Sequence, residues 1–214
     1  MTAFLFDLDG TLADSIDIIL QSSRMALEEL GYPQISDAQI TSLIGVPLLD
    51  TGERILGPGL GELYRECYQK HFLSLDIGKL NAFPGLAKTL AHLKAQGGKL
   101  ACVTSKRRFA AESSLKAIGL ADYFSALVCA ESTEQHKPAA EPAHKALAML
   151  NACAEKAIFI GDSIFDIGCA RNAGILSCGV LWGAGNEQEL TQAGADYIAH
   201  TVGELDSILD SQLL

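Results

Sequence analysis

The sequence predicts a doubly wound α/β fold that carries a helical insertion after its first strand. Past residue 80, short apolar runs of strand-like composition alternate with helical patterns. None of these runs has a polar face, so each is expected to be a parallel strand covered on both sides of the sheet. The five runs are Leu100–Val103, Ala126–Cys129, Ala157–Ile160, Ser177–Val180 and Tyr197–Ala199.

The first strand is predicted at the apolar run Phe4-Leu5-Phe6, and residues 14 to 80 then break the alternation. Residues 14–30 read as one long helix that ends at Gly31, and no strand is evident before residue 80. Further helical stretches are expected near 36–44, 48–56 and 60–73.

The predicted insertion divides the chain into a core of residues 1–13 and 82–214 and a helical subdomain of residues 14–81. Pro84-Gly85 marks the return to the core. We expect the subdomain above the carboxyl edge of the sheet, where such sheets bind ligands and where it could act as a lid. The alternative is a helical ornament that only packs on the core.

Two helices of the core are predicted from apolar spacing and glycine stop signals. Leu86, Leu90 and Leu93 have helical spacing ahead of Gly97, and the pattern over 107–118 ends at Gly119.

Composition excludes several classes of protein. The 214 residues carry a net charge of -10, from 16 Lys and Arg against 26 Asp and Glu, which argues against a nucleic acid partner. Six cysteines without a CxxC pair predict buried free thiols rather than disulfides or zinc ligands, and hence a reducing cytoplasm. No apolar run approaches the roughly 18 residues of a membrane span, so the protein is expected to be neither exported nor embedded.

An acid pair, Asp7 and Asp9, directly follows the first strand. Carboxylates beside an apolar run are costly unless paired or bound to a cation, so a positive charge is expected there. A turn signal at Asp9-Gly10 is the bland alternative. An EF-hand loop is excluded because Thr11 and Leu12 occupy its fifth and sixth positions.

Polar groups follow other predicted strands. Thr104 and Ser105 come at the mouth of a predicted helix, which is either an anion site or a plain N-cap. Lys137 precedes Pro138 in a polar loop, where a solvated side chain is the alternative. Asp162 and Asp166 stand about one helical turn apart, and a helix cap with a first-turn acid is the alternative for them.

The order of these groups resembles the four motifs of the haloacid dehalogenase superfamily, and the resemblance spans the whole chain. The motifs are Asp7-Leu8-Asp9-Gly10-Thr11-Leu12, Thr104, Lys137-Pro138 and Gly161-Asp162-Ser163-Ile164-Phe165-Asp166. The resemblance implies a Rossmann-like core, a small helical cap and a Mg²⁺-dependent phosphoryl transfer through a phosphoaspartate.

The same resemblance implies a role for each catalytic motif residue. Asp7 is the expected nucleophile. Asp9 is the expected general acid and then base. Thr104 with the N–H of Ser105 would hold a phosphate oxygen, and Lys137 would offset charge on the phosphate and on Asp7.

The implied Mg²⁺ ligands are Asp7, the backbone carbonyl of Asp9, Asp162 and, through a water, Asp166. A further set of residues is expected to contact substrate. That set is Gly10, Thr11, Ser105, Lys106 and Gly45. Arg24, Arg54 and His71 are additional cap candidates, for which a surface or packing role is the alternative.

The acid pair favours a phosphatase, since true dehalogenases of the superfamily lack the second acid, and no histidine follows Asp14-Ser15 as in hexose phosphomutases. Residues 43–48 and 179–183 resemble phosphoglycolate phosphatases. Residues 104–108 and 135–142 resemble the inorganic pyrophosphatase of the same branch, where Lys106, Arg107 and Arg108 would suit a second phosphate, a solvated helix face being the alternative.

A different class of function also remains, a phospho-acceptor or metal-binding module without turnover. It is disfavoured because receiver modules place the accepting Asp after a later strand and have no long helical insertion. The expected partner is a small phosphorylated metabolite, with no nucleic acid or membrane partner, and the expected state is a monomer or homodimer.

Overall fold

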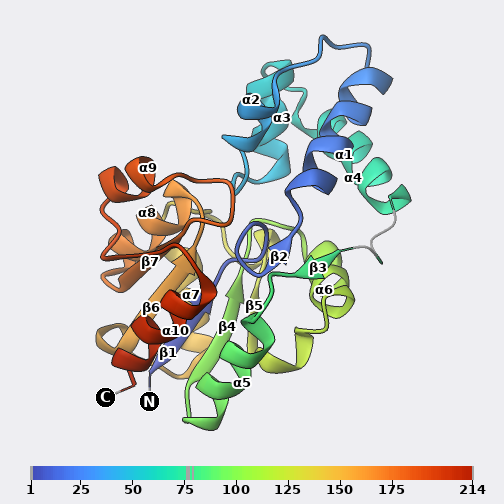
Figure 1. Cartoon of the computed structure of the whole chain (residues 1–214). Helices are drawn as coiled ribbons and strands as arrows, with labels where there is room; N and C mark the ends of the chain where they lie inside the picture. Colours follow the sequence, from blue (N-terminus) through green and yellow to red (C-terminus); the bar gives the residue numbers. More distant parts are fainter. Residues whose placement is uncertain (1, 76–77, 79, 214) are drawn as a thin grey trace.

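The computed structural model describes residues 2–75, 78 and 80–213, and its centre is a parallel sheet of six strands. The spatial order is β5-β4-β1-β6-β7-β8, so the first strand lies inside the sheet (Figure 1). The strands are β1 (Ala3–Phe6), β4 (Lys99–Val103), β5 (Ala126–Val128), β6 (Ala157–Gly161), β7 (Leu176–Val180) and β8 (Tyr197–Ala199). All the predicted strands are therefore confirmed.

Helices cover both faces of this sheet. Alternate residues of each strand point to opposite faces, and the apolar residues on both faces are buried under helices. Phe4 and Phe6 of β1 belong to the apolar cluster beneath α5, α6 and α10, whereas Leu5 belongs to the cluster beneath α7 and α8. The core helices are α5 (Leu86–Ala95), α6 (Arg108–Ala117), α7 (Glu141–Leu150), α8 (Ile164–Ala173), α9 (Glu187–Ala193) and α10 (Val202–Ser211). Short 3₁₀ turns are η2 (Ala121–Tyr123), η3 (Ala130–Ser132) and η4 (Ala154–Lys156).

Four helices between β2 (Ala13–Asp14) and β3 (Asn81–Ala82) gather beyond the carboxyl end of the sheet, and we call them the helical unit (Figure 1). They are α1 (Ile16–Glu29), α2 (Asp37–Thr41), α3 (Leu48–Leu56) and α4 (Gly61–Ser74). The unit has its own apolar cluster, in which Leu27 of α1 packs with Tyr64 and Phe72 of α4. Helix α2 is shorter than the predicted stretch, and a turn leads from it to Gly45.

A small antiparallel sheet, β2 (Ala13–Asp14) with β3 (Asn81–Ala82), joins the helical unit to the core. The expectation of no strand from residue 14 onward is therefore wrong at Asp14. Strands of two residues carry no periodic pattern, which is why the sequence does not reveal them. This sheet ties together the two segments through which the chain leaves and re-enters the core.

The cysteines are free, as predicted, and all except Cys153 are buried. Within the described part of the chain, no helix combines the length and the apolar character needed to cross a membrane.

Candidate active site

Asp7 lies where β1 ends and is almost completely buried. Its backbone N–H donates to the carbonyl of Ile160 at 2.9 Å, which continues the pairing of β1 with β6 by one residue. Its carboxylate is 2.8 Å from the ammonium of Lys137. Burial raises the pKa of Asp7 well above its usual value, and the charges of Asp166 and Asp162 add to this, against the opposing effect of Lys137.

A tight loop after Asp7 directs Asp9 toward the helical unit. Gly10 has a φ of 74°, and its N–H donates to the carbonyl of Ala13 at 2.9 Å. A Cβ at Gly10 would collide with the carboxylate of Asp162, so the loop and that acid fit only without a side chain here. Asp9 accepts a hydrogen bond from Ser15 Oγ at 2.5 Å and forms an ion pair with Lys106.

Asp162 follows β6 directly, and both of its carboxylate oxygens accept hydrogen bonds. The hydroxyl of Thr11 donates to Oδ1 at 3.0 Å, and the N–H of Ala184 donates to Oδ2 at 2.7 Å. Burial raises the pKa of Asp162 to about 7, and the neighbouring charge of Asp166 contributes. Two fixed donors therefore hold the carboxylate in place although its charged form is costly.

Asp166 lies in the first turn of α8, where the capping alternative proves to be real. The backbone N–H of Ser163 donates to Asp166 Oδ2 at 3.1 Å, and the Ser163 hydroxyl donates to the same oxygen at 2.6 Å. The other oxygen, Oδ1, is 2.6 Å from Lys137 Nζ. Asp166 thus completes the capping box that Ser163 begins and is also a partner of the buried lysine.

Lys137 links the acids from the loop before α7. Its ammonium contacts Asp7, Asp166 and, at 3.4 Å, the carbonyl of Val103. Burial acts to lower the pKa of Lys137, but the two carboxylates outweigh burial and raise it. The solvated alternative is therefore wrong for this lysine, and its two carboxylate partners favour the charged ammonium.

The acid triad of Asp7, Asp162 and Asp166 could hold a metal ion. One carboxylate oxygen from each residue lies within 4.8 Å of the others, and all three residues are buried. Hard oxygen donors of this kind suit Mg²⁺, and a bound cation would offset the buried negative charge that raises the pKa of Asp7 and of Asp162. The side chain of Asp9 is not in this triad.

Thr104 follows β4, and its loop contacts the helical unit. Its hydroxyl accepts from the N–H of Lys106 at 3.2 Å, while the Ser105 hydroxyl donates to the carbonyl of Gly45 at 2.5 Å. Helix α6 begins only at Arg108, so the prediction that Thr104 and Ser105 lie at a helix mouth or N-cap is wrong. The residues expected to bind phosphate lie instead in a loop that touches the helical unit.

A cleft lies between the loops after β1 and β4 and the helical unit. Asp7, Asp9, Thr104 and Lys106 line its core side. The opposite side is mainly apolar and includes Ile19, Ile44, Val46, Tyr64, Tyr68 and Phe72. Gly45 also lines the cleft, next to the hydroxyl of Ser163.

The proposed cationic cluster is not free for a second phosphate. Lys106 pairs with Asp9 and lies 4.9 Å from the ring centroid of Phe72. Arg107 pairs with Glu131 at 2.6 Å, and Arg108 lies 3.5 Å from Glu112. Each cation therefore has an acidic partner in this structure.

The remaining cap candidates lie away from the cleft. Arg24 pairs with Asp37, and His71 contacts Glu29. Neither they nor Arg54 line the cleft.

The sequence does not single out two groups that contact site carboxylates. Ser15 is the N-cap residue of α1, yet its side chain caps nothing and bonds Asp9 instead. Ala184 acts through a backbone N–H, which no residue type reveals.

The chain is similar in sequence to known hydrolases along most of its length. Residues 4–180 match the family model described as haloacid dehalogenase-like hydrolase. A phosphoglycolate phosphatase of Cupriavidus necator is 34% identical over 97% of this chain and 93% of its own length. A pyrophosphatase of Halalkalibacterium halodurans is 33% identical over 96% of this chain and 95% of its own length.

The fold is similar to that of solved hydrolases. A haloacid dehalogenase-like family hydrolase from Streptococcus pneumoniae superposes with a TM-score of 0.86 at 29% identity, covering 98% of each chain. The six-stranded parallel sheet and its flanking helices are therefore an architecture shared with that enzyme.

Proposed function

Because this chain belongs to the haloacid dehalogenase-like hydrolase family and is a phosphatase of that family, we propose that it hydrolyses small phosphomonoesters with Mg²⁺ through a phosphoaspartate at Asp7. The observation that carries this proposal is one buried arrangement. Asp7 contacts Lys137, and its carboxylate lies close enough to those of Asp162 and Asp166 for the three to bind one metal ion. Asp9, two residues further along the chain, lines the cleft.

Asp7 is the nucleophile in this proposal. One carboxylate oxygen attacks phosphorus while the bond from phosphorus to the leaving oxygen breaks, and Asp9 gives its proton to that oxygen. Asp9 then takes a proton from a water that attacks phosphorus, which releases inorganic phosphate and restores Asp7. In the structure Lys106 and Ser15 both hold Asp9, so Lys106 must release it before it can donate a proton.

The other residues bind and orient the phosphate. Thr104 and the N–H of Ser105 would hold one phosphate oxygen, Lys137 would neutralise charge on the phosphate, and Gly10 and Thr11 would shape the loop beside it. Mg²⁺ held by Asp7, Asp162, the Asp9 carbonyl and Asp166 would supply charge neutralisation at the phosphoryl group. The helical unit, within residues 14–81, would act as the cap over a core of residues 1–13 and 82–214.

Phosphoglycolate is the first candidate substrate and pyrophosphate the second, following the names of the two relatives. Both substrates carry a second anionic group, and among the described residues Lys106 and Arg107 are the cations that line the cleft. Both are paired with acids, so accommodating either anion requires one of them to change partner. A cytoplasmic location remains a prediction.

The test is phosphate release with Mg²⁺, with and without EDTA, on phosphoglycolate, pyrophosphate and a panel of sugar, nucleotide and aryl monophosphates. We expect Mg²⁺-dependent turnover of at least one monoester, and the substrate preference decides between the candidates. Lys106→Gln is expected to raise KM more for phosphoglycolate and pyrophosphate, which carry a second anionic group, than for the aryl monophosphates. A stable aspartyl phosphate without phosphate release would instead support the phospho-acceptor module.

A further inference from the structure

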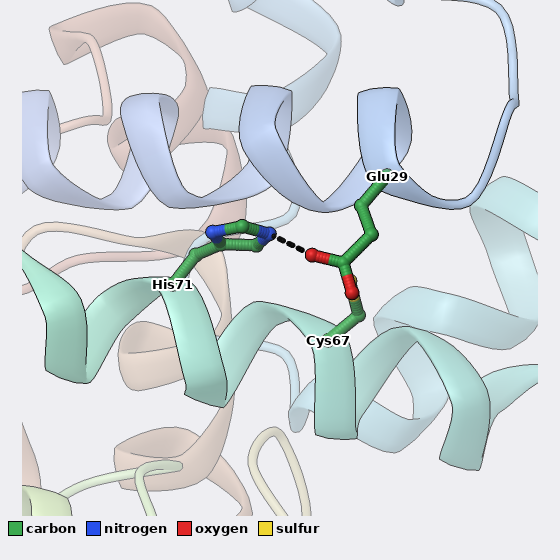
Figure 2. Close-up of side chains that lie close together, drawn as sticks. All are labelled: Glu29, Cys67 and His71. Atoms are coloured by element: carbon green, nitrogen blue, oxygen red, sulfur yellow. Dashed lines mark ion pairs between the residues drawn. The ribbon is translucent and has the colours of Figure 1, made fainter.

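A second cluster of metal-binding side chains lies between α1 and α4 of the helical unit (Figure 2). Glu29 is the last residue of α1, and Cys67 and His71 are four residues apart on α4. This spacing puts the cysteine and the histidine on one face of the helix, toward Glu29. One donor atom from each residue lies within 4.8 Å of the other two.

We propose that Glu29, Cys67 and His71 form a binding site for Zn²⁺ that is separate from the catalytic acid triad. A thiolate, an imidazole and a carboxylate are the ligand types that zinc selects, and they differ from the carboxylate-only set of Asp7, Asp162 and Asp166. None of the three residues lines the catalytic cleft. A water would complete a tetrahedral coordination sphere.

The histidine already faces one of the other two donors. His71 Nε2 is buried and lies 2.8 Å from Glu29 Oε2. An imidazole nitrogen turned toward a carboxylate in this way can share a cation with it. Figure 2 shows the ring and the carboxylate facing each other between the two helices.

The cysteine is buried, and its sulfur lies 3.7 Å from the carbonyl of Ala26, a weak hydrogen bond. Burial raises the pKa of the Cys67 thiol, and the charge of Glu29 adds to this effect. Binding of a divalent cation would reverse the balance by stabilising the thiolate, and the proton would leave to solvent.

Only modest movements of the donors are needed. Zinc–ligand bonds of about 2.0–2.3 Å separate tetrahedral ligands by about 3.3–3.7 Å, so donors within 4.8 Å need to close by about 1.5 Å at most. His71 Nε2 and Glu29 Oε2, which are 2.8 Å apart, need instead to separate slightly. Glu29 is half-exposed and stands at a helix end, so rotation of its side chain can supply most of this movement.

Lys70 is the competitor for the site. Its ammonium lies 2.7 and 2.8 Å from the two oxygens of Glu29, and hydrogen bonding from Lys70 lowers the pKa of that carboxyl. The lysine side chain is 65% exposed, so it can leave for solvent when a divalent cation arrives. If the cluster were only an ion-pair network, Lys70 would stabilise it through its pair with Glu29. If the cluster binds a metal ion, the same lysine competes with the metal for the carboxylate.

A metal at this position would fix the orientation of α4. The adjacent face of the same helix presents Tyr64, Tyr68 and Phe72 to the cleft. Binding between α1 and α4 would therefore stabilise the apolar side of the cleft without taking part in the chemistry.

The experiment is a titration of the full chain, free of any histidine tag and stripped of metal, first with Co²⁺ and then with Zn²⁺ in competition. Thiolate bound to Co²⁺ gives a charge-transfer band in the near ultraviolet, which the carboxylate-only catalytic triad cannot produce. We expect the band to rise to one equivalent of Co²⁺ and to be removed by Zn²⁺. Cys67→Ser should abolish it, and Cys153→Ser, which changes the exposed cysteine, should leave it intact.

Two further variants keep the test independent of the cysteine. His71→Gln is expected to weaken Zn²⁺ binding at least about tenfold, and Lys70→Ala to tighten it several-fold. An absent band, a band that survives in Cys67→Ser, or a Zn²⁺ affinity that Lys70→Ala leaves unchanged or lowers would each overturn the proposal. Phosphate release with Mg²⁺ by Cys67→Ser would be unaffected, so failure here is distinguishable from failure of the proposed hydrolysis.

Discussion

Replacing Asp162 with asparagine should stabilise the metal-free protein while abolishing its activity. Burial moves the pKa of this carboxyl from 3.8 to about 7, so its charged form opposes folding above neutral pH. At about 1.4 kcal/mol per unit, the penalty is at most about 4 kcal/mol. The amide nitrogen cannot accept a hydrogen bond, so Thr11 or Ala184 loses its acceptor at a cost of about 1–3 kcal/mol.

The expected net gain is about 1–3 kcal/mol at pH 8 in EDTA, or roughly 2–10 °C in Tm for a chain of this size. The sign with pH follows from the raised pKa of the acid. The penalty is absent below about pH 4, where the carboxyl is protonated in both folded and unfolded protein, and it grows as pH rises toward 8. The difference between Asp162→Asn and wild type should therefore shrink as pH falls.

The assay is thermal unfolding in EDTA at pH 5 and pH 8, with Asp196→Asn as the matched control. Asp196 also accepts two hydrogen bonds, both on Oδ2, from the N–H and hydroxyl of Ser177, but it is not in the acid triad, so its amide should bring no gain in stability at either pH. Adding Mg²⁺ should raise the Tm of wild type and not that of Asp162→Asn. A variant less stable than wild type at pH 8 in EDTA would refute the reasoning.

Three other substitutions test the site. Lys137→Met leaves Asp7 and Asp166 without their shared cation, so turnover should vanish and urea unfolding in EDTA should show a loss of about 3–5 kcal/mol; wild-type stability would contradict this. Ser15→Ala removes the hydroxyl that holds Asp9, and kcat should fall roughly tenfold with little change in KM; an unchanged kcat would exclude that role. Gly10→Ala should cost about 2 kcal/mol or more and weaken Mg²⁺ binding, whereas Gly31→Ala, with a φ of 70° and open space around it, should cost less and spare the metal.

The strands and most helices could be predicted because their patterns are local. Fully buried parallel strands read as apolar runs, and glycines with positive φ end α5 and α6 at Gly97 and Gly119. The short strands β2 and β3 could not be predicted, since strands of two residues have no period.

The motif acids and Lys137 could be recognised by their order after successive strands, but their partners could not. The structure alone shows that Asp166 serves Lys137 and the cap of α8 together. Arg107 forms an ion pair with Glu131, 24 residues away in the sequence. The sequence alone does not show this pair and therefore leaves Arg107 available to bind an anion. Tyr64, Tyr68 and Phe72 have ordinary core spacing, which does not reveal that they line a cleft.

The zinc ligands illustrate the same limit. Without a CxxC pair, Cys67 reads as a buried thiol, and only the packing of α1 on α4 brings Glu29 to it.

The central claim, that Asp7 carries the phosphoryl group, is tested most directly by rapid acid quenching during turnover, followed by peptide mass analysis. Wild type and Asp9→Asn, in which the residue proposed to activate water is replaced, are quenched with Mg²⁺ and an aryl monophosphate of the panel, whose leaving group needs little help from an acid. We predict a mass increase of one phosphoryl group on the peptide that contains Asp7, larger in Asp9→Asn and absent in the inactive Asp7→Asn. Turnover by Asp7→Asn at a rate near that of wild type, with no phosphorylated peptide in any sample, would contradict the account.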